Sequence, residues 1–324
     1  MARTLVTGGA GYIGMMLADE LLDAGREVTA LDVFLHDQRE QARTLRERGV
    51  RVVEGDVRDA EARRAALEGA DSVVHLAAIV GDPACARDPE LARAVNVDAS
   101  KALAGDAADA GVERFVMAST CSNYGRMADP TVPIDETGVL APVSLYAEQK
   151  VEVEQHLLAL DPPPFAVTCL RFATVYGAAP RMRFDLTVNE FTRDLWADRK
   201  LEVFGEQFWR PYVHVRDAAR GIRAVLEAPL QAVAGEVYNV GDSAENYRKL
   251  DLVGRIREQT DRGEVAYVHR DEDPRDYKVS FDKIRQRLGY AVTMTVPTGI
   301  AEVIAALDAG RFPDSDDVRY RNIP

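Results

Sequence analysis

The sequence predicts an α/β fold: a doubly wound parallel sheet, with a smaller and mostly helical portion towards the C-terminus. Two observations predict it. Short apolar strands alternate with helical segments over residues 3–171, and a glycine-rich turn at 8–14 follows the first strand directly. Strands that alternate with helices pair in parallel through right-handed crossovers. Ligands of such sheets bind beyond the carboxyl ends of the strands.

The elements follow from apolar periodicity and from capping residues. We expect strands at 3–7, 27–31, 51–54, 72–76, 114–118, 166–171 and 236–240. We expect helices at 13–24, 38–48, 59–68, 88–110, 144–160 and 215–228. The segment 174–210 is expected to be irregular, and 244–324 to be helical with one strand near 265–269. This divides the chain into a sheet domain, 1–177 plus about 211–243, and a ligand-binding portion, about 178–210 and 244–324.

The glycine turn and the second strand together predict a dinucleotide site. Gly8 allows a tight turn, Gly11 allows the backbone to approach a pyrophosphate, and Gly14 allows the helix to pack closely on the sheet. The helix N-terminus offers free N–H groups to the phosphates. Asp32 lies 21 residues after Gly11, where a carboxylate accepts hydrogen bonds from the adenosine ribose. Because a carboxylate there repels a 2′-phosphate, NAD is favoured over NADP. This order of features is typical of a Rossmann-like domain.

Charge and cysteine content exclude several classes of function. The net charge of −13 argues against nucleic acid or an anionic membrane as the main partner, although local arginines could still hold phosphate. Cys85, Cys121 and Cys169 show no ligand spacing, so we expect no disulfide framework and no metal site. No apolar run reaches the length that spans a membrane, and the first strand leaves no room for a signal peptide. We expect a cytoplasmic protein.

A tyrosine and a lysine one helical turn apart predict acid–base chemistry. Tyr146 and Lys150 share a helix face, and an ammonium beside a phenol stabilises the phenolate, lowering a pKa of about 10. Lys150 could also hold the nicotinamide ribose. The hydroxyl of Thr120, at a strand end, could share a substrate oxygen with Tyr146. We interpret His75 as a strand-end residue whose ring is satisfied by hydrogen bonds rather than as a catalyst.

Three motifs carry a resemblance that covers essentially the whole chain. The glycine turn at 7–14, the run Ala118–Gly125 and Tyr146-x-x-x-Lys150 resemble the extended short-chain dehydrogenase/reductases. Within them the chain is similar to the NAD-dependent nucleotide-sugar epimerase/dehydratase family. The resemblance implies Thr120, Tyr146 and Lys150 as catalytic residues. It implies a cofactor site made of Gly8, Gly11, Tyr12, Ile13, Asp32, Asp56, Val57, Leu76, Ala77, Ala78 and Lys150.

The resemblance also implies a substrate, a nucleotide-diphosphate sugar. Arg210 matches a diphosphate-binding arginine, and Arg270 falls where a second one often lies, with Arg275 a close competitor. A guanidinium fork matches phosphate oxygens. Arg181 and Arg183 could reach the same ligand, although exposed loop arginines are common. The expected substrate-binding residues are Ser122, Thr174, Asn189, Arg210 and Arg270.

One departure from the family pattern narrows the choice among the family's reactions. The family's 4,6-dehydratases carry an Asp-Glu pair after the catalytic threonine, where this chain has Cys121 and Ser122. Eliminating water needs a further acid and base, so dehydration is disfavoured. The leading hypothesis is epimerisation at C4 through a keto intermediate. A ketoreductase of deoxysugar or specialised-metabolite biosynthesis is the alternative.

Two further expectations accompany this hypothesis. A non-catalytic NAD-sensing protein is the alternative from another class, and the presence of Tyr146 and Lys150 argues against it. Family members usually pair through the two long helices that here begin near Asp88 and Ser144, so a homodimer is expected. Cys121 is interpreted as a packing residue rather than as a thiol that moves protons.

Overall fold

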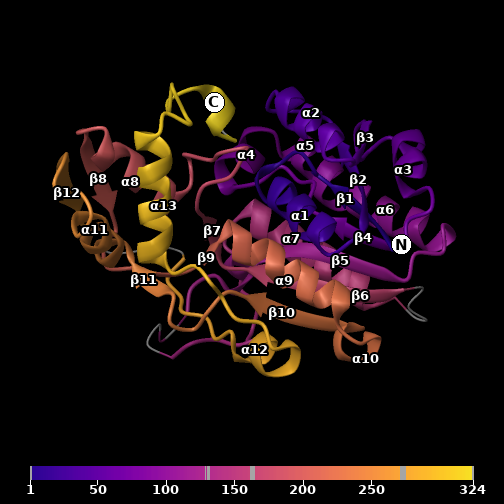
Figure 1. Cartoon of the computed structure of the whole chain (residues 1–324). Coiled ribbons are helices and arrows are strands. Elements are labelled where there is room, and N and C mark those ends of the chain that lie inside the picture. The colour runs from indigo at the N-terminus through magenta and orange to yellow at the C-terminus, as the bar shows by residue number, and fades with distance from the viewer. Residues whose placement is uncertain (1, 128, 130–131, 161–164, 271–274, 323–324) are drawn as a thin grey trace.

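A seven-stranded parallel sheet forms the centre of the N-terminal part of the protein (Figure 1). The structure is a computed structural model that describes residues 2–127, 129, 132–160, 165–270 and 275–322. The strand order is β10-β6-β5-β4-β1-β2-β3, and all six pairings are parallel, which confirms the predicted fold class. These strands are β1 (Arg3–Thr7), β2 (Glu27–Asp32), β3 (Arg51–Glu54), β4 (Ser72–His75), β5 (Arg114–Thr120), β6 (Ala166–Phe172) and β10 (Glu236–Val240).

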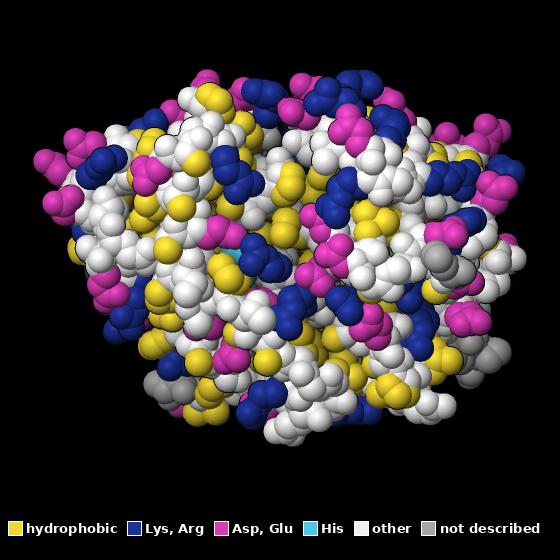
Figure 2. All heavy atoms as spheres, in the orientation of Figure 1, with side chains coloured by type: hydrophobic (Ala, Val, Ile, Leu, Met, Phe, Trp, Pro, Cys, Tyr) yellow, Lys and Arg dark blue, Asp and Glu magenta, His cyan; other side chains and the backbone are white. Residues whose placement is uncertain are grey.

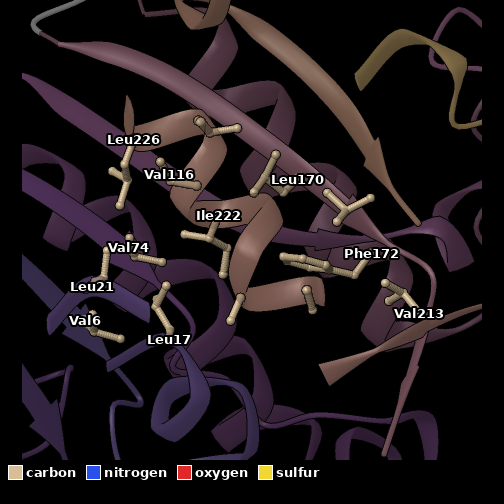
Figure 3. Close-up of a cluster of buried hydrophobic side chains, with 14 of the residues drawn as sticks. Val6, Leu17, Leu21, Val74, Val116, Leu170, Phe172, Val213, Ile222 and Leu226 are labelled. Atoms are coloured by element: carbon tan, nitrogen blue, oxygen red, sulfur yellow. The ribbon is translucent and has the colours of Figure 1, made fainter. Parts of the chain in front are cut away.

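Helices cover both faces of this sheet, because consecutive side chains of a strand point to opposite faces. Val6 packs with one cluster, against α1 (Tyr12–Asp23), α2 (Arg39–Glu47) and α9 (Val215–Glu227). Its neighbour Leu5 packs with the other cluster, against α3 (Ala60–Leu67), α6 (Ala99–Asp109) and α7 (Leu145–Leu158). Figure 3 shows the first cluster, where Leu17 and Leu21 of α1 and Ile222 and Leu226 of α9 meet Val6, Val74, Val116 and Leu170 of the strands.

The expected long helix over 88–110 is divided into shorter elements. α4 (Asp82–Arg87) precedes α5 (Pro89–Arg93), which Asp88 caps by accepting a hydrogen bond from Leu91 N. A π-helical turn over Ala94–Asp98 then leads into α6. Within this turn, the buried side chain of Asn96 bonds both the backbone of Ile79 and the side chain of Gln149 in α7.

The segment 174–210 was expected to be irregular, and that expectation is wrong. It contains β7 (Thr174–Tyr176), α8 (Thr187–Trp196), β8 (Lys200–Phe204) and the start of β9 (Trp209–His214). β9 pairs with β7 and with β11 (Asn246–Arg248), while β8 pairs with β12 (Glu264–Val268). Each strand finds its partner far along the chain, so local sequence gives little signal. The other described α-helices after α9 are α10 (Leu230–Val233), α11 (Lys249–Arg257), α12 (Asp282–Leu288) and α13 (Val296–Asp308). Short 3₁₀ turns lie after β5, at Cys121–Tyr124, and near the C-terminus, at Val318–Tyr320.

Our first prediction concerns the contact between α1 and the turn before it. A Cβ at Gly14 would lie 2.6 Å from the Gly9 carbonyl oxygen and closer still to that of Gly8. Gly14→Ala should therefore lower the free energy of unfolding by about 1–3 kcal/mol. The control is Gly105→Ala in α6, where a Cβ meets nothing within 4 Å, and it should be neutral or stabilising by up to about 1 kcal/mol. Urea unfolding measures both; equal losses would contradict the prediction.

Candidate active site

One large cavity, with a volume of about 500 Å³, runs along the carboxyl ends of the central strands. It extends from the glycine turn and Asp32 to Tyr146 and Lys150 of α7. The cavity therefore lies where a doubly wound sheet binds its ligands. Most of the residues expected from the sequence line it: Gly8, Gly11, Tyr12, Ile13, Asp32, Asp56, Val57, Leu76, Ala77, Ala78, Thr120, Ser122, Tyr146, Lys150 and Thr174.

The end of the cavity at the glycine turn fits a dinucleotide. Gly8 has φ +69°, and a Cβ there would lie 3.0 Å from Ala77 N, so only glycine fits this approach to β4. Gly11 is the N-cap of α1 and offers no capping side chain, which leaves the first N–H groups of the helix for a phosphate. The Asp32 carboxylate accepts hydrogen bonds from Ala10 N (3.0 Å) and Phe34 N (2.9 Å), which fix its orientation at the cavity wall. Burial raises its pKa despite these bonds.

Tyr146 and Lys150 are buried at the other end of the cavity. Lys150 Nζ donates to the Ala118 carbonyl oxygen at 2.8 Å and lies 5.9 Å from the centroid of the Tyr146 ring. Burial lowers the pKa of Lys150 to about 8. We expected Lys150 to lower the pKa of Tyr146, and this is wrong for the protein without a ligand: burial raises that pKa, and the Cys85 thiol raises it further. A phenolate at Tyr146 therefore needs another positive charge in the cavity.

The 3₁₀ turn after β5 presents Thr120 and Ser122 to the cavity and turns Cys121 away. Thr120 Oγ1 accepts a hydrogen bond from Ser122 N (3.1 Å), and Ser122 Oγ lies 3.4 Å from the hydroxyl of Tyr277. Cys121 is 1% exposed, and its thiol donates to the Arg171 carbonyl oxygen at 3.2 Å. Burial raises the thiol pKa, so Cys121 packs in the core as the sequence interpretation held.

A buried polar network behind the cavity was not foreseen from the sequence. Glu154 of α7 accepts hydrogen bonds from Ser119 Oγ of β5 (2.8 Å) and from Arg171 Nε of β6 (3.2 Å). Asn123 Nδ2 also donates to Ser119 Oγ at 3.0 Å. The network joins the helix that carries Tyr146 and Lys150 to the strand that carries Thr120. A glutamate on the apolar face of a helix and an arginine within an apolar strand were the available signals.

His75 is held in the interior, as the sequence indicated. Its ring nitrogens lie 2.8 Å from Thr7 Oγ1 and 2.8 Å from Ser100 Oγ. Burial lowers its pKa to about 3, so the ring is neutral. Both nitrogens are thus used within the fold.

Three expected substrate-binding residues do not line the cavity. Asn189 is 0% exposed, and its amide accepts from Gly177 N (2.8 Å) and donates to Arg183 O (2.9 Å). Arg210 is buried with its guanidinium over the Tyr277 ring, 5.4 Å from the centroid. Arg270 is exposed over the Phe204 ring. Asn189 therefore serves the internal packing of this loop, and Arg210 lies behind the wall of the cavity that Tyr277 forms.

Three arginines do line the cavity. Arg275 pairs with Asp82 at 3.0 Å, which places it, and not Arg270, at the cavity wall. Arg181 and Arg183 line it as well, and both are largely buried. They are not exposed loop arginines, which was the alternative to their reaching a ligand, because the C-terminal segment packs over them.

Among the described residues, no group of three or more His, Cys, Asp or Glu side chains could hold a metal ion. None of the helices in the described part of the chain is long and apolar enough to cross a membrane. On the face shown in Figure 2, Lys and Arg are interspersed with Asp and Glu and do not gather in one basic patch.

Our second prediction follows from the buried ammonium of Lys150. The unfolded chain holds this proton up to an ordinary pKa of 10.5, whereas the folded chain releases it at about 8. Between these values the unfolded state binds more protons, so the free energy of unfolding rises with pH, by at most about 1.4 kcal/mol per pH unit. Lys150→Met should remove this rise, while Lys101→Met, on the partly exposed surface of α6, should keep it. Urea unfolding at several pH values is the measurement; a rise that survives in Lys150→Met would contradict the prediction.

Comparison with known proteins identifies the family. A sequence profile of the NAD dependent epimerase/dehydratase family matches residues 4–241. The dTDP-glucose 4,6-dehydratase of Streptomyces griseus is 32% identical over 317 residues, which cover 93% of this chain and 92% of that protein. The UDP-glucose 4-epimerase of Bacillus subtilis is 28% identical over 344 residues and 98% of each chain. The crystal structure of Thermus thermophilus UDP-glucose 4-epimerase in complex with NAD has a TM-score of 0.83 at 27% identity, covering 94% of this chain and 99% of that one. The profile spans most of the chain, and the expected cofactor and acid–base residues share one cavity. The protein therefore belongs to the NAD dependent epimerase/dehydratase family, within the extended short-chain dehydrogenase/reductases, and its cofactor is NAD.

Proposed function

We propose that the protein is an epimerase of a nucleotide-diphosphate sugar that inverts C4 through a transient keto intermediate. One observation carries the proposal: Thr120, Tyr146 and Lys150 converge on the dinucleotide cavity, and no described carboxylate lines the cavity beside them. Among the described residues that line the cavity, the acids are Asp32 and Asp56. Both lie at the end near the glycine turn, where the adenosine of NAD is expected to bind and which we call the adenosine end. The described residues of the wall near Tyr146 offer hydroxyls and cations and no second acid–base pair.

This acid content argues against dehydration, although relatives of both types exist. Removing water from a sugar requires an acid for the leaving hydroxyl and a base for the neighbouring C–H, in addition to the tyrosine. The two positions after Thr120 hold a core-packed thiol, Cys121, and a hydroxyl, Ser122. Neither has the chemistry of a carboxylate at neutral pH.

In the proposed mechanism Tyr146 removes the proton from the C4 hydroxyl, and the hydroxyl of Thr120 hydrogen-bonds the same oxygen. NAD, when bound, would accept the C4 hydride and give it back to the other face of the keto sugar, and it would also supply a positive charge. That charge favours the phenolate of Tyr146 against the burial that raises its pKa. The keto sugar then presents its other face, and Tyr146 returns the proton. Lys150, held by the Ala118 carbonyl, lies where it can bind the nicotinamide ribose.

The structure suggests how the diphosphate of the sugar nucleotide would be bound. We propose Arg275 and Arg210 as the two arginines, with Ser122 and Thr174 contacting the sugar. Arg275 lines the cavity, and Arg210 lies directly behind Tyr277. The substrate assignments of Asn189 and Arg270 lose support, since the amide of Asn189 bonds other residues of the protein and Arg270 lies away from the cavity.

Our third prediction tests the reaction. The protein is incubated with UDP-glucose or dTDP-glucose carrying deuterium at C4, without added reduced cofactor, and the product is followed by NMR. A C4 epimer that retains the deuterium supports the proposal. A 4-keto-6-deoxy product would identify a dehydratase, and turnover of a keto sugar only with added NADH or NADPH would identify a ketoreductase. Either outcome would overturn the epimerase assignment.

The same assay tests the acid–base residue. Tyr146→Phe keeps the ring but removes the ionisable oxygen, so kcat should fall by on the order of 10²–10⁴. The control is Tyr267→Phe on β12, whose exposed ring lies outside the cavity and which should retain full activity. Near-normal turnover by Tyr146→Phe would exclude Tyr146 as the base.

Our fourth prediction concerns assembly. We propose a homodimer that pairs through α6 and α7, as the family resemblance implies. The two helices lie side by side, and Glu152 of α7 pairs with Lys101 of α6 at 2.8 Å. Light scattering at micromolar concentration should give twice the chain mass of 35.7 kDa. A single-chain mass under these conditions would contradict the proposal.

A further inference from the structure

The segment between β7 and α8, residues 177–186, crosses the adenosine end of the cavity. Its first residue, Gly177, accepts a hydrogen bond from the hydroxyl of Tyr12, the first residue of α1, at 2.6 Å. Three residues on, Pro180 O accepts from Gln41 Nε2 of α2 at 3.1 Å. The segment therefore extends from the glycine turn to α2, opposite the end of β2 where Asp32 lies.

The C-terminal residues 316–322 lie on top of this segment. Phe184 N donates to Tyr320 O at 2.8 Å, and Asn322 N donates to the Asp185 carboxylate at 3.2 Å. In Figure 1 the C-terminal segment, in yellow, lies between α13 and α2. We call residues 177–186 and 316–322 together the roof. Arg181, Arg183 and Asn322 are the roof residues with the polar groups nearest the ligand space, since all three line the cavity.

Arg181 is a buried cation with an unused hydrogen-bond donor. It is 3% exposed, and its Nη2 donates to Arg321 O at 3.0 Å, but its Nε has no hydrogen-bond partner among the described residues. Burial lowers the pKa of Arg181 to about 10, so the guanidinium remains charged at neutral pH. A buried charge with an unsatisfied N–H is costly unless a ligand completes its surroundings.

The position of Arg181 identifies the ligand group. Its charge acts on Asp32 and His36, which places it at the adenosine end and not beside the substrate hydroxyl. The Asp32 carboxylate accepts from two backbone N–H groups and takes no hydrogen bond from Arg181 Nε, and its remaining acceptor sites are those expected to bind the ribose hydroxyls. The remaining acceptor of opposite charge there is the cofactor's pyrophosphate, which the N-terminus of α1 binds from the other side.

Arg183 lies beside it and holds the wall in shape. Its guanidinium makes a two-pronged pair with Asp185, through Nε (3.0 Å) and Nη2 (2.7 Å). Asp185 in turn holds the C-terminal segment through Asn322 N. The charge of Arg183 is thus largely balanced by Asp185. Of the two roof arginines that line the cavity, this leaves Arg181 available to an anionic ligand.

We propose that Arg181 is a cofactor-binding residue that donates to the pyrophosphate of NAD from the roof, opposite the glycine turn. The dinucleotide is then bound between the N-terminus of α1 and a guanidinium. The proposal rests on the NAD dependence of the family and not on which sugar is the substrate, so failure of the epimerase assignment leaves it standing. A charge-assisted hydrogen bond of this kind also slows the release of a cofactor that must stay bound between the two hydride transfers.

The test measures binding by calorimetry with the full chain freed of nucleotide, using adenosine, ADP, NAD and UDP as ligands. Arg181→Gln should lower the affinity for ADP and for NAD by about 10- to 100-fold, because one charge-assisted hydrogen bond is lost. Its affinity for adenosine and for UDP should be unchanged. Arg181→Lys should recover part of the loss for ADP. The control Arg216→Gln, an exposed arginine paired with Glu302, should bind all four ligands normally.

Three outcomes would overturn the proposal. An unchanged affinity for ADP would show that Arg181 does not contact the cofactor phosphates. A lower affinity for UDP with an unchanged affinity for ADP would assign Arg181 to the substrate's diphosphate instead. An equal loss for adenosine and ADP would indicate a general disturbance of the roof, a result that Arg181→Lys would then share. Retention of NAD through gel filtration provides a second readout, and Arg181→Gln should lose the cofactor faster than the wild type.

Discussion

The buried ion pair between Glu154 and Arg171 is the interaction on which the geometry of the site depends. Both side chains lie in the interior, and together with Ser119 they join α7, β5 and β6 at the carboxyl edge of the sheet. Arg171 also donates to the Tyr124 hydroxyl (3.0 Å), which donates in turn to Asn239 of β10. Such a pair contributes little net stability, but removing one partner costs about 3–5 kcal/mol. Its function is positional: it holds the helix with Tyr146 and Lys150 against the strand with Thr120.

Burial sets the electrostatics of the site before any ligand arrives. It raises the pKa of Tyr146 and lowers that of Lys150, so both groups tend towards their neutral forms. No described carboxylate lines the cavity beside Tyr146. The negative charge that can balance an incoming cation there is therefore the phenolate of Tyr146. The protonation state of the tyrosine thus becomes coupled to the charge of the nicotinamide, which changes when hydride is transferred.

Much of the fold and most of the residues that line the cavity could be predicted because their signals are local. The glycine turn, Asp32 and the Tyr146–Lys150 spacing each lie within one supersecondary unit, so neighbouring residues determine their geometry. The strands β7, β8 and β9 were missed because they pair with segments distant in sequence. The burial of Asn189 and Arg181 likewise depends on contacts with residues 177 and 321, which no local pattern reveals. The pKa of Tyr146 was mispredicted because spacing shows a neighbouring charge but not the loss of solvent.

The roof gives the cavity two ends with different neighbours. The adenosine end is bordered on one side by residues 177–186 and 316–322, whereas the end at Tyr146 is bordered by Arg275 and Tyr277. Substrate and cofactor therefore need not enter and leave the cavity by the same route. A sugar nucleotide could exchange at each turnover while residues 316–322, which border the cofactor's end of the cavity, stay in place. The hydrogen bonds that hold residues 316–322 on residues 177–186 would then influence how long one dinucleotide stays bound.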